Sequence, residues 1–225
     1  MSTEAAVEEK EVKVKEPLFS TKNKKLITDP LNDDNPITVQ VLGICSALAI
    51  TVQVEQAVVM SLSVVFVMIA GNLLISLMRN AIPSRIRIIV QLVVVASLVI
   101  IVSEVLKAFL PDVAARLSVF VGLIITNCII MGRFEAFAMG NKAWPSILDG
   151  FGNAIGYAWI LVAVAVVREL FGSGKLFGVE VVPAAFYELG YMNNNMMILP
   201  PMALVTVGVI IWIQRARNTK LIEEN

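Results

Sequence analysis

Residues 117–133 read LSVFVGLIITNCIIMGR, and their pattern is the strongest indication of the fold. This stretch is apolar enough to enter a membrane, yet the polar run Thr126-Asn127-Cys128 interrupts it. An earlier stretch at residues 37–52 has the same character, because the run Gly43-Ile44-Cys45-Ser46 stands among its aliphatic residues. Irregular backbone at membrane depth is tolerated only where protein buries it or where it lines a cavity. The two stretches therefore predict two short or broken membrane segments.

The composition of the whole chain supports a membrane-embedded body. Of its 225 residues, 57% are hydrophobic and 16% are charged, whereas a typical soluble domain has about 45–50% and about 25%. The first 36 residues hold 14 of the 36 charges, and residues 37–213 hold only 17. We expect a polar cytoplasmic extension at 1–36, a transmembrane domain at 37–213 and a cytoplasmic tail at 214–225. The extension has no apolar h-region, so a signal peptide is not expected.

Four further segments, added to the stretches at 37–52 and 117–131, are long enough to cross a hydrocarbon core of about 30 Å. They are 57–78, 86–109, 148–167 and 196–213. The order short, long, long occurs twice, in residues 37–109 and 117–213. Three helices per half is an odd number, so the halves insert in opposite orientations. The prediction is an all-α integral membrane protein with six transmembrane segments in two inverted repeats, whose first and fourth segments are short or broken.

The basic residues near the segment ends set the orientation. Fourteen of the 18 Lys and Arg fall on the side that holds both termini. The other side receives Lys107, Arg116, Arg168 and Lys175. Cytoplasmic loops carry the excess of basic residues, so both termini are expected in the cytoplasm.

Several chemistries are excluded by composition. The chain has no histidine, which excludes serine–histidine catalysis and histidine-ligated metals. No phosphate-binding glycine motif and no basic patch with aromatic residues is present, so neither a nucleotide site nor nucleic-acid binding is expected.

The two cysteines, Cys45 and Cys128, are the first candidates for a site. Each lies in one of the two interrupted segments, and the repeat would place them opposite each other. Packing and a disulfide are both open alternatives, since membrane cysteines often act as small apolar residues. Thiolates also bind iron–sulfur clusters, and a [2Fe–2S] centre takes four, which two cysteines here and two from a partner would satisfy. The neighbours Ser46 and Asn127 are expected to donate hydrogen bonds to sulfur.

Two acidic residues are candidates for a cation path. Asp149 opens the glycine-rich fifth segment, and Glu104 lies near the end of the third. Ionisable groups at membrane depth often mark ion paths, although Asp149 would equally favour a helix N-terminus. The pair Gly152 and Gly156 has the spacing of a close-packing helix face. The remaining charges at segment ends are expected to be interfacial anchors and ion pairs: Arg133, Glu135, Arg168 and Glu169.

Three motifs carry a resemblance to a known family. Residues 40–49 (QVLGICSALA), 117–133 and 168–178 (RELFGSGKLFG) resemble the D-subunit family of the sodium-translocating NADH:quinone oxidoreductases. The resemblance covers roughly residues 32–212. The related E subunits of Rnf electron-transport complexes usually have proline after the first cysteine, where this chain has Ser46. Phe134 and Glu104 depart from the family pattern, which usually has alanine and aspartate there.

The resemblance implies one member of a six-subunit complex in the bacterial inner membrane that couples electron transfer to Na⁺ export. It implies that Cys45 and Cys128 hold a [2Fe–2S] cluster shared with the homologous, inversely oriented E subunit. NADH, FAD, FMN, riboflavin and ubiquinone would bind only elsewhere in the complex, among the A, B, C and F subunits. Alternative interpretations are the E subunit of an Rnf-type complex, a small inverted-repeat secondary transporter, and a structural membrane scaffold.

Overall fold

The computed structural model describes residues 21–32, 34–83, 85–109, 111–177, 179–180 and 195–217. The described chain is helical apart from one antiparallel ribbon, in which Lys175 pairs with Glu180. The helices are α1 (Thr21–Asn32), α2 (Ile44–Ile50), α3 (Val54–Met78), α4 (Arg87–Phe109), α5 (Pro111–Ile125), α6 (Cys128–Arg133), the π-helix η1 (Phe134–Ala138), α7 (Ala143–Ser173), the 3-10 helix η2 (Asn195–Ile198) and α9 (Pro200–Arg217). The ribbon strands are β1 (Lys175–Leu176) and β2 (Val179–Glu180).

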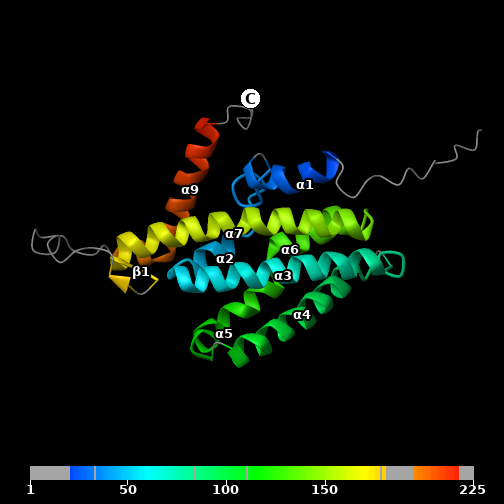
Figure 1. The fold of residues 1–225 in the computed structure, drawn as a ribbon, viewed down its shortest axis with the longest axis horizontal. Coiled ribbons are helices and arrows are strands. Elements are labelled where there is room, and N and C mark those ends of the chain that lie inside the picture. Colours follow the sequence, from blue (N-terminus) through cyan, green and yellow to red (C-terminus); the bar gives the residue numbers. More distant parts are fainter. Residues whose placement is uncertain are drawn as a thin grey trace, which may run out of the picture.

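The centre of the molecule is the pair α3 and α7, which lie side by side along the longest axis (Figure 1) and make the most extensive helix contact. Helices α4 and α5 lie on the α3 side of this pair, and α1 and α9 lie on the α7 side. The core between the helices consists of aliphatic side chains such as Val64, Val67 and Leu161, which are fully buried. Helices that are apolar on all faces are typical of membrane spans or of large cores.

Among the described residues, four helical stretches are long and apolar enough to cross a membrane: Val54–Met78, Arg87–Phe109, Phe120–Ala138 and Ala143–Ser173. An all-α membrane protein is therefore the observed class. The first predicted segment contains only the seven-residue helix α2, in agreement with its expected shortness. The sixth differs from expectation, because Gln214, Arg215 and Arg217 lower the mean hydropathy of the eighteen residues of α9, which falls outside the four.

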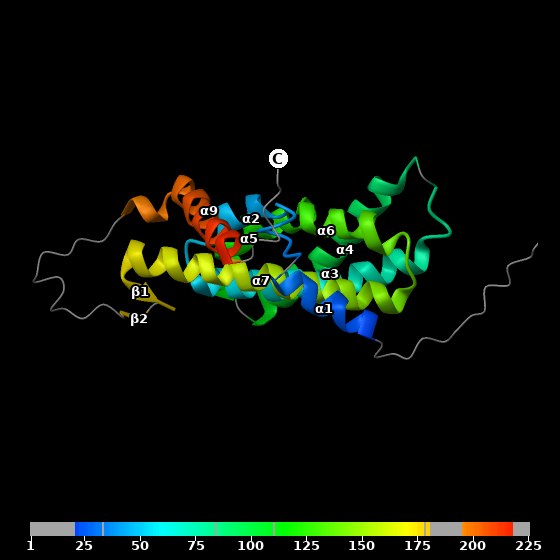
Figure 2. The same ribbon diagram turned by 90° about the horizontal axis from the view of Figure 1, so that it is seen from above.

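Helix α1 packs along α7, as both ribbon views show (Figures 1 and 2). Gly152 and Gly156 make this possible, because a Cβ on either would lie 2.4 Å from a carbonyl oxygen, that of Leu26 or that of Pro30. The prediction of a close-packing glycine face is thus confirmed. Its partner was not predicted, since α1 belongs to the polar stretch assigned to an extension.

Asn35 anchors the chain that leads from α1 to the first cysteine. Its side-chain N–H donates to the Gly156 carbonyl at 3.1 Å, while its own carbonyl oxygen accepts from the N–H of Ile37 at 3.0 Å and of Thr38 at 3.3 Å. An asparagine that bonds the backbone two residues on is a common turn device. The turn ties the start of the 37–52 stretch to the middle of α7.

Candidate functional site

Both cysteines stand at the start of a short helix. Helix α2 begins at Ile44, and its N-cap Gly43 has the left-handed backbone conformation (φ 79°, ψ 12°) that favours glycine. Helix α6 begins at Cys128, and its N-cap Asn127 accepts a hydrogen bond from the Ile129 N–H at 3.3 Å. The polar runs of the two interrupted segments are therefore helix starts. Each places a cysteine in the first turn.

The structure brings the two cysteines together. The sulfur of Cys128 lies against the backbone of Gly43, two residues before Cys45. The Gly43 N–H donates to the Cys128 sulfur, with 3.0 Å between N and Sγ. Both cysteines are free, so the disulfide alternative is not what the structure contains. Cys45 is exposed and Cys128 is partly buried, which leaves one side of the pair open.

This arrangement fits half of a thiolate-ligated iron–sulfur site. Within the residues that the structure describes, no group of three or more histidine, cysteine or acidic side chains could hold a metal ion. The chain therefore offers two sulfur ligands on an open side, and a four-thiolate [2Fe–2S] centre takes two more from elsewhere. A hydrogen bond to a ligand atom, such as the N–H···S bond from Gly43, is a contact of the kind that tunes metal ligands.

A buried polar network lies next to the thiols. The Ser46 hydroxyl donates to the Gly43 carbonyl at 2.8 Å and lies 2.7 Å from the Tyr157 hydroxyl. The Asn127 side-chain N–H approaches the same Ser46 oxygen at 3.4 Å. Ser46 and Asn127 were expected to donate to sulfur; instead they bond to each other, and the donor to sulfur is the Gly43 backbone.

Tyr157 is a residue that the sequence analysis missed. It is fully buried on α7. A tyrosine inside an apolar helix needs a partner for its hydroxyl, and that requirement could have singled out Tyr157. The partner itself comes from α2, 111 residues earlier in the chain.

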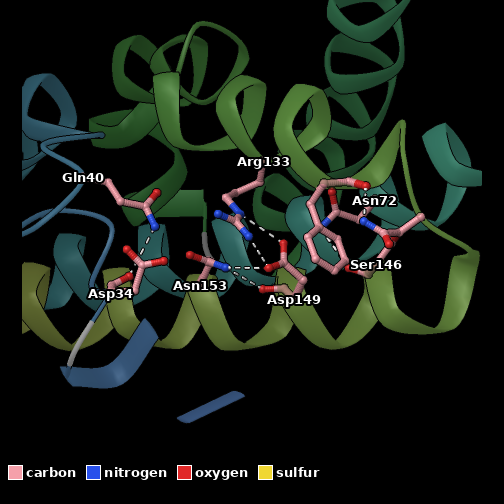
Figure 3. Close-up of polar contacts among 9 residues, drawn as sticks. Asp34, Gln40, Asn72, Arg133, Ser146, Asp149 and Asn153 are labelled. Carbon is pink, nitrogen blue, oxygen red and sulfur yellow. Dashed lines mark hydrogen bonds and ion pairs between the residues drawn. The ribbon is translucent and has the colours of Figure 1, made fainter. Parts of the chain in front are cut away.

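Asp149 forms a buried ion pair with Arg133. The guanidinium of Arg133 donates through Nε to Oδ2 at 3.0 Å and through Nη2 to Oδ1, and Asn153 donates to Oδ1 at 3.1 Å (Figure 3). The side chain of Asp149 is 2% exposed and that of Arg133 is 15% exposed. Helix α7 begins at Ala143, earlier than predicted. Asp149 therefore lies inside the helix, and the helix-cap alternative for this residue is wrong.

Two buried amide oxygens accompany this ion pair. The side-chain oxygens of Asn72 and Asn153 have no hydrogen-bond partner among the described residues. Both residues are fully buried, and the Asn72 nitrogen donates to the Ser146 carbonyl at 3.0 Å. The close-up shows Asn153 and Asn72 on either side of Asp149 (Figure 3).

Glu104 has a different environment. It pairs with Lys107 one turn along α4 at 2.8 Å, and both side chains are more than half exposed. The two candidate cation-path acids are thus in separate ion pairs, one exposed and one buried. Glu135 pairs with Arg87, as an interfacial charge was expected to do.

Arg168 and Glu169 are not simple interfacial anchors. Arg168 is 1% exposed, and its guanidinium donates to Thr51 Oγ1 at 2.5 Å and to the Leu48 carbonyl at 3.4 Å, at the end of α2. Further donors reach the carbonyls of η2 and the residue after it: Met197 at 3.1 Å, Ile198 at 2.6 Å and Leu199 at 3.3 Å. Glu169 accepts the Val54 N–H at 2.6 Å, at the start of α3. The two charges therefore hold helix ends.

Comparisons with known proteins place the chain in a family. A family described as "Rnf-Nqr subunit, membrane protein" matches residues 23–211. The chain is a multi-pass membrane protein and belongs to this Rnf-Nqr family. It is 55% identical over 189 residues to the D subunit of the Na(+)-translocating NADH-quinone reductase of Photobacterium profundum, an overlap of 84% of this chain and 90% of that relative. The resemblance drawn from the three sequence motifs is thereby confirmed.

Proposed function

We propose that this chain, as the D subunit of a Na⁺-translocating NADH-quinone reductase, supplies two of the four thiolate ligands of a [2Fe–2S] cluster inside the membrane. The observation that carries the proposal is the pair of free, adjacent thiols on two short helices, with Gly43 donating to one sulfur at 3.0 Å. A bound [2Fe–2S] cluster supplies one-electron transfer. Cys45 and Cys128 would hold it, and the open side of the pair would receive the partner's ligands.

The partner in this proposal is the homologous E subunit, oriented inversely. The six-segment inverted repeat belongs to the same proposal, and the parallel roles of α2 and α6 support it, because each begins at a cysteine motif and precedes a long apolar helix of the central pair. The A, B, C and F subunits would complete the complex in the bacterial inner membrane. They would bind NADH, FAD, FMN, riboflavin and ubiquinone, and both termini of this chain would be cytoplasmic.

The proposal also includes a path for Na⁺ along acidic residues of this chain. Asp149 is a carboxylate within an apolar helix. Beside it lie the side-chain oxygens of Asn72 and Asn153, which have no hydrogen-bond partner among the described residues. Oxygen ligands suit hard cations. Glu104 would contribute a second carboxylate from α4, on a face that is exposed in this chain.

The ligand proposal is tested by replacing Cys45 or Cys128 with alanine in the assembled complex. Each variant should lose the electron paramagnetic resonance signal of the shared cluster, its iron, and NADH-driven quinone reduction. NADH oxidation by an artificial acceptor should persist, since the flavin lies elsewhere in the complex. Serine variants should do little better, because a hydroxyl oxygen is a poor replacement for thiolate.

Ser61→Ala is the matched control, because the Ser61 hydroxyl is buried and, within the described part of the chain, bonds only to the Ala57 carbonyl of its own helix, at 2.7 Å. It should keep signal, iron and turnover. If both cysteine-to-alanine variants reduce quinone at the wild-type rate, the cysteines are packing residues. If the wild-type complex has no paramagnetic resonance signal that the cysteine variants lack, the transporter or scaffold alternative would be favoured.

A further inference from the structure

Tyr157 connects the two cysteine segments from a third element. Its hydroxyl lies 2.7 Å from the hydroxyl of Ser46, which directly follows Cys45. The same Ser46 oxygen lies 3.4 Å from the side-chain nitrogen of Asn127, which directly precedes Cys128. The fully buried phenol group on α7 is thus linked through Ser46 to the neighbours of both cysteines.

The direction of these hydrogen bonds follows from the number of protons available. A serine hydroxyl donates once and accepts twice. The Ser46 proton goes to the Gly43 carbonyl at 2.8 Å, so Tyr157 is the donor to Ser46. The hydrogen bonds therefore run from Tyr157 to Ser46 and on to the Gly43 carbonyl, and the N–H of the same Gly43 donates to the Cys128 sulfur.

The ring of Tyr157 also packs against Gly43. A Cβ at Gly43 would lie 3.1 Å from Cε2 and 3.4 Å from Cδ2 of the ring. The ring therefore covers Gly43 on the side where a side chain would project. The left-handed conformation of Gly43 aims its N–H at sulfur, and the ring and the hydroxyl of Tyr157 both support that conformation.

We propose that Tyr157 is a positioning residue of the cysteine pair, which holds the Gly43 N–H on the Cys128 sulfur and so raises the redox potential of the group that the thiols bind. The inference rests on the proposed function. Hydrogen bonds to ligand sulfur favour the reduced, more negatively charged state of such a group, and they are one of the main controls of its potential. Among the described residues Tyr157 has no hydrogen bond to sulfur, and it acts through Gly43 and Ser46.

The test is Tyr157→Phe in the full complex, because phenylalanine keeps the ring and removes only the hydroxyl. The signal to follow is the paramagnetic resonance that Cys45→Ala abolishes. Iron content and assembly should be retained, whereas the midpoint potential should shift to more negative values and the g-values should change. Ser46→Ala should shift the midpoint potential and the g-values in the same direction as Tyr157→Phe. The double variant Tyr157→Phe/Ser46→Ala should shift the midpoint potential by less than the sum of the two single shifts, since both substitutions break the same hydrogen bond between Tyr157 and Ser46.

Ser61→Ala again serves as the control for the loss of a buried hydroxyl and should leave the potential and the spectrum unchanged. Wild-type potential and g-values in Tyr157→Phe would overturn the inference, as would a shift in Tyr157→Phe that Ser46→Ala does not share. If Tyr157→Phe fails to assemble, Ser46→Ala takes its place: a more negative midpoint potential supports the inference, and a wild-type potential overturns it. If the wild type and Cys45→Ala give the same paramagnetic resonance spectrum, the result would instead overturn the proposed function itself.

Discussion

At the scale of single residues, a backbone group contacts the Cys128 sulfur. The Gly43 N–H makes this contact at 3.0 Å. Glycine is favoured there, since its φ is 79° and a Cβ would lie within 3.1 Å of the Tyr157 ring. The buried ion pair of Asp149 with Arg133 is the second residue-scale feature. It joins α7 to the helix that begins at the second cysteine.

The charge of Asp149 can be tested by Asp149→Asn. If the carboxylate attracts sodium, the apparent half-saturation of turnover should rise on the order of tenfold. The estimate follows from a loss of ~1.7 kcal/mol for unit charges about 10 Å apart at an effective dielectric constant near 20. The sodium-independent rate should change little. The measurement is a sodium titration of quinone reduction at fixed ionic strength.

The control for Asp149→Asn is the double variant with Arg133→Gln. In the single variant the Arg133 guanidinium loses its counter-charge and would repel a cation. The double variant removes that charge, so part of the sodium affinity should return. Equal half-saturation in wild type and Asp149→Asn would show that Asp149 is only a structural partner of Arg133.

At the scale of elements, the short helix α2 depends on its neighbours. Seven residues do not form a stable helix alone in water, and Arg168 holds the carboxyl end of α2 through Leu48 and Thr51 while it also binds the chain before α9. A planar guanidinium is suited to reach several acceptors at once. Helix α1 depends in the same way on α7, through the glycine face.

Arg168→Lys tests whether Arg168 holds the carboxyl end of α2. Lysine has three donors in a compact group and would leave several buried carbonyls without partners, at roughly 1–3 kcal/mol for each such group. The complex should unfold at lower temperature and carry less iron, because α2 positions Cys45. The matched control is Arg79→Lys, at the corresponding end of α3, which should behave as wild type. Equal iron content in both variants would contradict a role in holding α2.

Gly156→Ala tests whether α1 depends on its packing against the glycine face of α7. The new methyl group would lie 2.4 Å from the Pro30 carbonyl oxygen, which is backbone and cannot rotate away, and overpacking typically costs about 1–3 kcal/mol. Hydrogen–deuterium exchange in residues 21–32 should speed up about tenfold or more. Gly208→Ala on α9, where no described atom outside the neighbouring backbone of the same helix lies within 4 Å of the added Cβ, should leave exchange unchanged. Unaltered exchange in Gly156→Ala would mean that α1 does not depend on this contact.

At the scale of the whole molecule, the length of α7 predicts which loops share a side of the membrane. Its 31 residues extend about 46 Å at ~1.5 Å per residue, which exceeds the hydrocarbon core of about 30 Å. We therefore expect the residues before Ala143 and after Ser173 to lie on opposite sides of the membrane. The basic residues favour the cytoplasm for the Ala143 end.

Topology reporters test this orientation. A reporter after Glu224 or at Lys142 should be cytoplasmic, and one inserted near Ser173 should lie outside, which is the side expected from six segments. The Lys142 insertion is the matched control, because it samples the opposite end of the same helix. A cytoplasmic reporter at Ser173 would contradict both the six-segment count and the inverted repeat.

The sequence alone determined the membrane class, the two interrupted segments, the cysteines at their centres and the glycine face of α7. Each of these follows from hydropathy, helix breaks or residue spacing, which are local properties of the chain. The tertiary structure alone decided the partners of the buried polar groups. Tyr157 with Ser46, Arg133 with Asp149, and Arg168 with the end of α2 each join different elements. A buried polar group must find a partner, but which partner it finds depends on how the helices pack, and no local pattern contains that information.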